Sequence, residues 1–139
     1  MNIQLATQSD YESCLPFDKR LTPELFTYLT EQEQLFIARE GEDTVGYLRL
    51  EYIWYKIPYI SWINVREDLR AQGIGRKLFD HLYEFLKKKN FTFLLSSFQD
   101  NADKSQRWHK KMGFYHCGKI AGLNEDDSHE IFCKLDIKS

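Results

Sequence analysis

The sequence predicts a mixed α/β fold, in which a mostly antiparallel sheet of about seven strands is flanked by about four helices. The first observation is a series of short segments rich in β-branched and aromatic residues. The second is a pair of amphipathic helical patterns, after residues 73 and 101, with one expected strand between them. A helix joining the fourth strand to the fifth makes these two strands parallel. No linker or repeat interrupts the 139 residues, so we expect a single domain, 1–139.

The seven expected strands alternate apolar and polar residues or form short apolar runs. They are residues 2–7, 34–40, 44–55, 59–65, 91–98, 114–120 and 129–137. The sequence "GED" is expected to turn the chain between the second and third strands, and Lys56-Ile57-Pro58 between the third and fourth. The second, third and fourth strands therefore read as a meander.

The helices are indicated by capping residues and by apolar spacing. Thr22 is expected to cap a helix that starts at Pro23. Apolar residues at offsets of three to four form one face of a second helix, with Lys87, Lys88 and Lys89 at its C-terminal end. The residues of this face are Ile74, Leu78, Phe79, Leu82, Phe85 and Leu86. A third helix, over 102–112, ends before Gly113, which suits a left-handed cap.

Composition excludes several classes of protein. A net charge of −2 disfavours nucleic-acid binding as the main role, because that role usually shows as a basic surplus. Cys14, Cys117 and Cys133 are odd in number and lack metal-ligand spacing, so we expect packed, reduced thiols and no metal. No signal peptide opens the chain, and no apolar run approaches the ~18 residues of a membrane span. We therefore expect a cytoplasmic protein without membrane or nucleic-acid partners.

The stretch "RAQGIGRK" places Gly73 and Gly75 between an expected strand and an expected helix. Two glycines there allow either of two interpretations. They could only relieve strain in a turn, or they could let an anion approach the first N–H groups of the helix. Arg70 and Arg76 would add positive charge for phosphate oxygens. A dinucleotide-binding loop would need a third glycine at Leu78, and no Walker A pattern is present.

The pattern Arg-x-x-Gly-x-Gly at 70–75, after a strand that ends in valine, resembles the signature of the GCN5-related N-acetyltransferase (GNAT) superfamily. A second block agrees with this resemblance: Asn101, followed by "SQRWHKKMGF" from Ser105 to Phe114. Together with the order of elements, the resemblance covers roughly residues 34–135. It implies a GNAT fold in which the fourth and fifth strands splay apart.

The resemblance also implies a function and a cofactor site. It implies transfer of acetyl from acetyl-coenzyme A to a primary amine by direct attack, with a small molecule or a peptide as acceptor and no metal. The pantetheine arm would lie between the splayed strands, along the backbone of the fourth strand. Asn101 would contact the pantetheine region. The implied strand residues are Ile63, Asn64 and Val65, and the pyrophosphate loop is Arg70, Ala71, Gln72, Gly73, Ile74, Gly75 and Arg76.

The sequence departs from the family at the acid and base. Many members carry tyrosine where this chain has His109, which could protonate the leaving thiolate or could be a structural residue bonded to the backbone. The fourth strand carries no carboxylate, so Glu51 on the third is the nearest candidate base. Glu51 could equally be a solvated surface charge, with a water relay in its place.

Other functions remain open at this level. A non-catalytic or weakly catalytic acetyl-coenzyme A sensor would share the cofactor site, and a nucleotide-binding domain of another class would share only the glycine loop. The acceptor pocket is expected beside the early helices and the third and fourth strands, where the aromatic segment 52–62 lies. Exposed aromatics there would indicate an apolar or cationic acceptor, or a homodimer contact.

Overall fold

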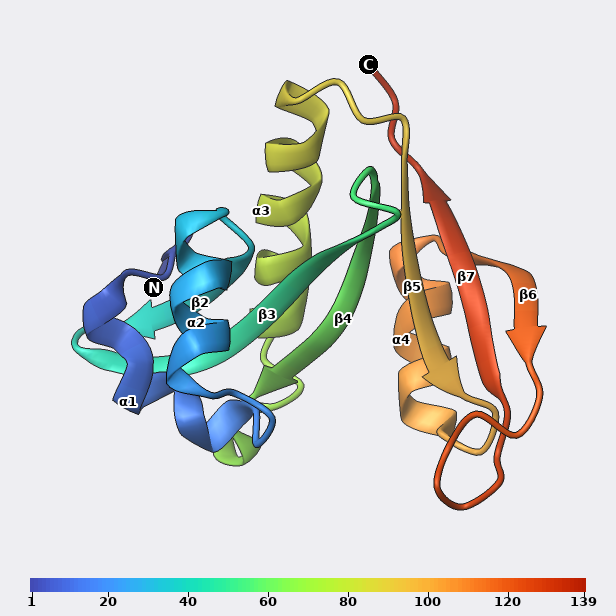
Figure 1. Cartoon of the computed structure of the whole chain (residues 1–139), viewed down its shortest axis with the longest axis horizontal. Helices are drawn as coiled ribbons and strands as arrows, with labels where there is room; N and C mark the ends of the chain where they lie inside the picture. The colour runs from blue at the N-terminus through green and yellow to red at the C-terminus, as the bar shows by residue number, and fades with distance from the viewer. The chain divides into compact units, whose positions relative to one another are not determined.

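A computed structural model describes all 139 residues, Met1–Ser139. The chain forms two compact units. The first unit is Met1–Glu51 with Ser61–Phe85, and the second is Tyr52–Ile60 with Leu86–Ser139. The helices are α1 (Tyr11–Cys14), α2 (Pro23–Glu31), α3 (Ile74–Lys88) and α4 (Asp103–Met112), labelled in Figure 1.

Seven strands form one mixed sheet, in the order β1-β2-β3-β4-β5-β7-β6. They are β1 (Asn2–Leu5), β2 (Leu35–Glu40), β3 (Asp43–Ile53), β4 (Ile57–Val65), β5 (Phe93–Gln99), β6 (Tyr115–Ile120) and β7 (Glu130–Asp136). The pairs β1–β2, β2–β3, β5–β7 and β6–β7 are antiparallel. β4 and β5 are parallel, with Tyr59 opposite Leu95. The predicted fold class, including its parallel pair, is confirmed.

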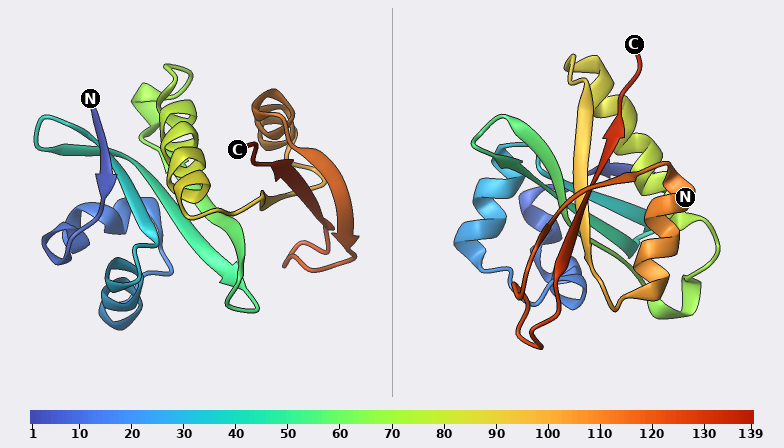
Figure 2. Two further views of the ribbon diagram at one scale, coloured as in Figure 1. Left: turned by 90° about the horizontal axis from the view of Figure 1, so that it is seen from above. Right: turned by 90° about the vertical axis from the view of Figure 1, so that its right-hand side faces the viewer.

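The first unit places helices on both faces of its strands, as the left view of Figure 2 shows. The α1 and α2 face is held by one buried apolar cluster. Its members are Ala6, Cys14, Phe17, Leu21, Phe26, Leu29, Leu35, Ile37 and Tyr47. On the α3 face, the ring of Phe36 packs against the rings of His81 and Phe85, with ring centroids 5.7 and 5.1 Å apart. The predicted cap of α2 is confirmed, since Thr22 Oγ1 accepts the N–H of Leu25 at 3.2 Å.

In the second unit, α4 covers one face of β5, β7 and β6 (Figure 2). Leu94, Ser96 and Phe98, which alternate along β5, are buried on this face together with Met112 and Phe114. Gly113 ends α4 with φ 103°, a conformation that L side chains rarely adopt, so the predicted cap is confirmed. None of the helices is both long enough and apolar enough to cross a membrane.

The hairpin between β3 and β4 differs from the prediction. β3 ends at Ile53, two residues early, and β4 already includes Ile57 and Pro58. The turn is made by Trp54 and Tyr55, with φ 55° and 61°, and is closed by the N–H of Lys56 on the carbonyl of Ile53 at 3.1 Å. Hairpin turns with two positive φ values normally use asparagine and glycine. The aromatic residues therefore read as strand in the sequence although they form the turn.

Candidate functional site

The loop predicted to bind an anion follows β4 in the first unit. Residues 70–73 are exposed, and both Ala71 and Gly73 have positive φ, 65° and 87°. The N–H of Lys77 donates to the carbonyl of Gly73 at 3.0 Å, so this bond closes the first turn of α3. The N–H groups of Ile74, Gly75 and Arg76 come before this first helical bond, so they have no acceptor within the helix. A Cβ at Gly73 would meet no atom within 4 Å, so space is open beside the loop.

Both arginines of the loop have partners within the first unit. Arg70 donates from Nε to the carbonyl of Val65 at 3.0 Å and from Nη2 to Oδ1 of Asn64 at 3.2 Å. Arg76 pairs with Asp80 at 3.3 Å, one turn along α3. Arg70 therefore fastens the loop to the end of β4, and the predicted contact of both arginines with phosphate oxygens stays a prediction.

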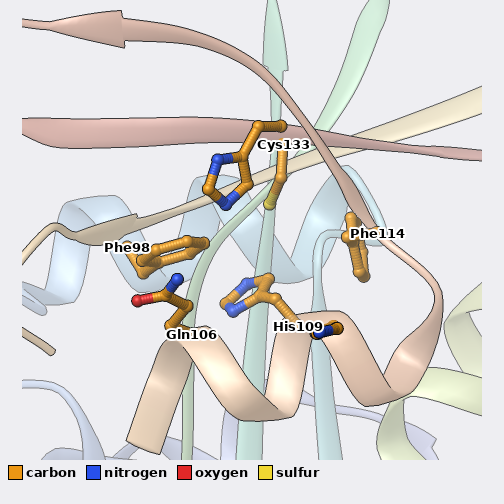
Figure 3. A pocket seen from close by; sticks show the side chains of 7 residues that line it. Phe98, Gln106, His109, Phe114 and Cys133 are labelled. Atoms are coloured by element: carbon orange, nitrogen blue, oxygen red, sulfur yellow. The ribbon is translucent and has the colours of Figure 1, made fainter. Parts of the chain in front are cut away.

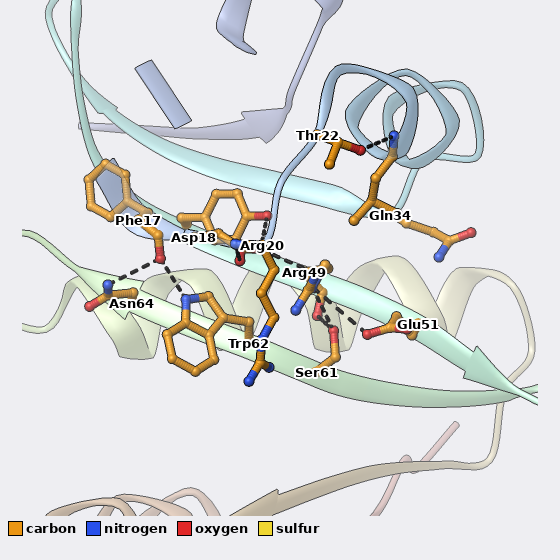
Figure 4. Close-up of polar contacts among 12 residues, drawn as sticks. Phe17, Asp18, Arg20, Thr22, Gln34, Arg49, Glu51, Ser61, Trp62 and Asn64 are labelled. Carbon is orange, nitrogen blue, oxygen red and sulfur yellow. Dashed lines mark hydrogen bonds and ion pairs between the residues drawn. The ribbon is translucent and has the colours of Figure 1, made fainter. Parts of the chain in front are cut away.

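A second feature of the first unit is a cavity of about 400 Å³ beside β4. It is lined by Pro16, Phe17, Asp18, Lys19, Arg20, Trp62 and Asn64. The indole N–H of Trp62 donates to the carbonyl of Phe17 at 2.6 Å, and the amide of Asn64 donates to the same carbonyl at 3.3 Å (Figure 4). Lys19 and Arg20 are exposed, so the cavity combines an aromatic wall with a cationic rim.

Asp18, which lines this cavity, is the centre of a buried polar cluster (Figure 4). Oδ2 of Asp18 accepts the hydroxyl of Tyr47 at 2.8 Å and lies 3.3 Å from Nη1 of Arg49. Burial and the hydrogen bond to Asp18 raise the pKa of Tyr47, so its hydroxyl stays protonated. Arg49 also donates from Nε to Ser61 at 3.1 Å. This cluster holds the segment before α2 against β3 and β4.

Glu51, the candidate base, lies at the margin of the cluster. Its side chain is 51% exposed and sits 3.8 Å from Nε of Arg49. Glu51 is therefore a largely solvated carboxylate that already has a charged partner. This position agrees with the surface-charge interpretation, and a catalytic role for Glu51 stays a prediction.

His109 lies in the second unit, buried in a side-chain cluster on α4 (Figure 3). Its Nδ1 is 2.7 Å from the carbonyl of Ser105, which can only accept, so Nδ1 carries the proton. In the neutral ring Nε2 then accepts the hydroxyl of Ser96, at 2.7 Å. Burial lowers the pKa of His109 below its usual 6.5, despite the bond to Ser105 and the charge of Glu130. These contacts match the structural interpretation of His109, and its role as general acid stays a prediction.

The His109 cluster borders a cavity of about 310 Å³ in the second unit. Cys133 lines it, and its thiol donates to the carbonyl of Ser96 at 3.3 Å. Burial raises the pKa of both Cys14 and Cys133 to about 12, so neither forms a nucleophilic thiolate at neutral pH. Cys117 differs from the expected packed thiols: it is exposed, as is every residue of edge strand β6.

Asn101 follows β5 in the second unit and is exposed. Its side-chain amide donates to Oδ2 of Asp126, in the β6–β7 loop, at 3.1 Å. The Asn101 amide therefore already has a partner within the chain, and its contact with the cofactor stays a prediction. No group of three His, Cys, Asp or Glu side chains in the chain is placed to hold a metal ion.

Comparison with known proteins decides the family. The sequence model described as the acetyltransferase (GNAT) family matches residues 3–114, most of the chain. The chain belongs to this family. A comparison with curated proteins gave no match.

Solved structures show the same GNAT fold. Ard1 from Thermoplasma volcanium has a TM-score of 0.88 at 19% identity, over 99% of this chain and 98% of that one. A ribosomal-protein-alanine N-acetyltransferase from Brucella melitensis has a TM-score of 0.83 at 17% identity, over 98% and 99% of the two chains. A putative streptothricin acetyltransferase from Bacillus anthracis, in complex with acetyl coenzyme A, has a TM-score of 0.68 at 22% identity. The match covers 75% of this chain and 62% of that one.

The structure therefore separates the GNAT residues predicted from sequence into two groups. The end of β4 and the loop 70–76 lie in the first unit, whereas Asn101 and His109 lie in the second. Sequence reasoning missed the Asp18–Arg49 pair and a hydrogen-bonded chain of Tyr59, Ser97 and Glu130. Neither forms a local motif, because Asp18 and Arg49 are 31 residues apart and the bonded residues of the chain are at least 33 residues apart. The one sequence signal is strand alternation, which places Ser96 and Ser97 on opposite faces of β5.

Proposed function

We propose that this GNAT protein is an N-acetyltransferase that transfers acetyl from acetyl-coenzyme A to a primary amine. The observation that carries the proposal is the loop 70–76, which presents a glycine with φ 87°, open space beside it and the N-terminal turn of α3. This geometry suits a pyrophosphate, because backbone N–H groups and the helix dipole both favour an anion. Acetyl-coenzyme A would supply the activated acetyl thioester. The acetyl coenzyme A complex of the Bacillus anthracis relative supports this choice of donor.

The chain's residues divide the task. Gly73, Ile74, Gly75 and Arg76 would bind the pyrophosphate through backbone N–H groups, and Arg70 would hold the loop in place through Val65 and Asn64. The backbone of Ile63–Val65 would bind the pantetheine arm as an added strand does. The amine would then attack the thioester directly. Raised pKa values of Cys14 and Cys133, to about 12, argue against a covalent acetyl-cysteine at either position.

The cavity beside β4 is the proposed acceptor pocket. Its apolar wall is formed by Phe17 and Trp62, and its rim carries the cations Lys19 and Arg20. A cationic rim disfavours a simple ammonium and favours an acceptor that also carries an anionic group. We expect an amine with a neighbouring carboxylate to react at least tenfold faster, in kcat/KM, than the same amine with a carboxamide. Equal rates, or a faster carboxamide, would contradict this acceptor class.

The donor site is tested by a matched pair of glycine substitutions. Gly73→Ala and Gly41→Ala impose similar strain, since Gly41 has φ 62° and also has open space around a Cβ. Only Gly73 belongs to the proposed loop, so only its substitution should weaken acetyl-coenzyme A binding, by at least tenfold. At saturating acetyl-coenzyme A, a tenfold weaker affinity lowers the stabilisation of the folded protein by the donor by about 1.4 kcal/mol. Equal weakening by both changes would refute the site.

The alternative is a sensor that holds acetyl-coenzyme A without efficient turnover. Two observations favour this alternative. β4 carries no carboxylate that could act as base, and both ring nitrogens of His109 already have partners within the chain. Thiol release across a panel of amines separates the two: an enzyme releases coenzyme A with at least one amine, whereas a sensor is only stabilised by the donor. His109→Phe should lower turnover well over tenfold if His109 is the acid, with donor affinity nearly unchanged.

A further inference from the structure

The proposed acceptor pocket beside β4 is lined by residues of the first unit alone. One side is the segment 16–20, which precedes α2, and the other side is Trp62 and Asn64 of β4. Its volume of about 400 Å³ lies near the lower end of the range for small-molecule sites. The pocket therefore suits a small acceptor.

Hydrogen bonds and ring packing fix the apolar wall of this pocket. The carbonyl of Phe17 accepts the indole N–H of Trp62 at 2.6 Å and the side-chain amide of Asn64 at 3.3 Å. The ring of Phe17 stacks on that of Tyr47, with centroids 6.3 Å apart. Trp62 is 41% exposed, so part of its indole is open to a ligand. The wall is thus formed before any acceptor binds.

The one carboxylate that lines the pocket is already bound on both oxygens. Oδ1 of Asp18 accepts the backbone N–H of Arg20 at 3.1 Å. Oδ2 accepts the hydroxyl of Tyr47 at 2.8 Å and lies 3.3 Å from Nη1 of Arg49. Because its side chain is only 3% exposed, Asp18 is not available to pair with the ammonium group of an acceptor. The charges that the pocket offers to a ligand are those of Lys19 and Arg20, both positive.

Arg20 is the better placed of these two cations. Its backbone is held by the bond to Asp18, while its side chain is exposed and lines the pocket (Figure 4). No hydrogen bond or ion pair within the chain engages its guanidinium. A guanidinium can donate two parallel hydrogen bonds to a carboxylate, whereas the ammonium of Lys19 acts as a point charge. All the other arginines of the first unit have partners in the chain: Arg39, Arg49, Arg66, Arg70 and Arg76.

We propose that the acceptor is a free α-amino acid with a large apolar side chain, and that Arg20 determines this specificity by binding its carboxylate. The inference rests on the proposed function, since it names the acceptor class of that same site. Phe17 and Trp62 would contact the apolar side chain. No carboxylate of the pocket competes for Arg20, because Asp18 is fully bound.

The pocket and the proposed donor site share one strand of the first unit. Trp62 and Asn64 lie on the same face of β4, since side chains alternate along a strand. Ile63, between them, begins the backbone segment proposed to bind the pantetheine arm. An acceptor held against these two side chains therefore lies beside the proposed donor strand. In an α-amino acid the amine is on the carbon that carries the carboxylate, so a carboxylate bound to Arg20 also restricts the position of the amine.

The test uses the full chain with acetyl-coenzyme A and a small set of acceptors. These are L-phenylalanine, L-leucine, their carboxamides and glycine, and the measurement is kcat/KM from thiol release. The wild type should prefer each acid to its carboxamide by about tenfold or more. It should also prefer phenylalanine or leucine to glycine by about tenfold or more, because only these bury an apolar side chain.

Substitutions of Arg20 test its part in this preference. Arg20→Gln should lower the ratio of kcat/KM for acid over carboxamide by roughly 10- to 100-fold, because it removes a charge-assisted pair. The loss should lie mainly in KM, since the guanidinium would bind the carboxylate before and during attack alike. Arg20→Lys keeps the charge without the fork, so its loss should be smaller. Arg107→Gln is the matched control and should keep the wild-type ratio, because Arg107 is an exposed arginine of α4 that does not line the pocket.

The outcomes separate this inference from the proposed function. The inference is overturned if acids and carboxamides react equally, if glycine matches phenylalanine and leucine, or if Arg20→Gln keeps the wild-type ratio. An equal loss in Arg107→Gln, a loss in kcat alone, or turnover only with amines outside this class also overturns it. In each of these cases the wild type still acetylates an amine, so the proposed function stands. If the wild type releases thiol with no amine at all, both are wrong. Should Arg20→Gln fail to fold, Arg20→Lys carries the test.

Discussion

Two aspartate–arginine pairs in the first unit differ mainly in burial, and they should respond very differently to the same substitution. Asp18 and Arg49 lie 3.3 Å apart with side chains 3% and 8% exposed. Asp68 and Arg66 lie 2.7 Å apart with side chains that are largely exposed. Asp18→Asn and Asp68→Asn each remove one charge from one ion pair with almost no change in shape. The comparison therefore sets a buried carboxylate, which also accepts the hydroxyl of Tyr47, against an exposed one.

The expected magnitude follows from what remains around Arg49. After Asp18→Asn its nearest carboxylate is Glu51, 3.8 Å away and half in solvent, so the buried guanidinium is poorly compensated. Breaking a buried pair from one side costs about 3–5 kcal/mol. With an unfolding entropy of ~2.1 cal/mol/K per residue over 139 residues, the melting temperature should fall by about 10–17 °C. Asp68→Asn should cause no resolvable change, because water already screens that pair.

Thermal and urea unfolding of the two variants provide the assay. The double variant Asp18→Asn, Arg49→Met should be more stable than Asp18→Asn alone, since it removes the unpaired charge. The reasoning is refuted if Asp18→Asn and Asp68→Asn lower the free energy of unfolding equally, or if the double variant loses the sum of its single changes.

Three further predictions concern strained or titrating positions of the fold. Tyr55→Gly should raise the free energy of unfolding by about 0.5–1 kcal/mol, because the side chain is 94% exposed and its φ of 61° suits glycine. A lower free energy of unfolding in urea would contradict this. Gly113→Ala should lower the free energy of unfolding by more than Gly122→Ala, because both have positive φ but only the first Cβ would approach Leu135, at 3.2 Å; equal losses in thermal melts would contradict the contact. His109 has its pKa lowered in the folded chain, so its contribution to stability is complete above about pH 6.5 and is lost as the pH falls below it. Urea unfolding at pH 7.5 and 5.5 should show that loss in the wild type and a smaller one in His109→Gln.

Elements with strong local signals could be predicted from the sequence. Thr22 before Pro23, the apolar spacing of α3 and Gly113 after α4 each encode a helix end or a buried face within a few residues. The same holds for the loop 70–76, whose glycines and following helix are contiguous. Family membership followed from this loop and the block 101–114, both of which are local patterns.

Elements that depend on a turn conformation or on distant partners could not be predicted. Trp54 and Tyr55 have high strand propensity, but the chain must reverse there to pair its strands, so both adopt positive φ. Likewise, His109 could be read from sequence as an acid or as a structural residue. Its contacts with Ser105 and Ser96 fill both ring nitrogens, and only one of these partners is near in sequence.

The sequence by itself determined the family, the fold class and the position of the glycine loop before α3, because spacing and backbone conformation at those positions are set by neighbouring residues. Only the tertiary structure decided which side chains that are distant in sequence are hydrogen-bonded to one another. Tyr59, Ser97 and Glu130 come from three strands, successive members lie at least 33 positions apart, and no local pattern relates them. Their geometry exists because sheet pairing brings β4, β5 and β7 side by side, and alternation along each strand then chooses the face on which they meet.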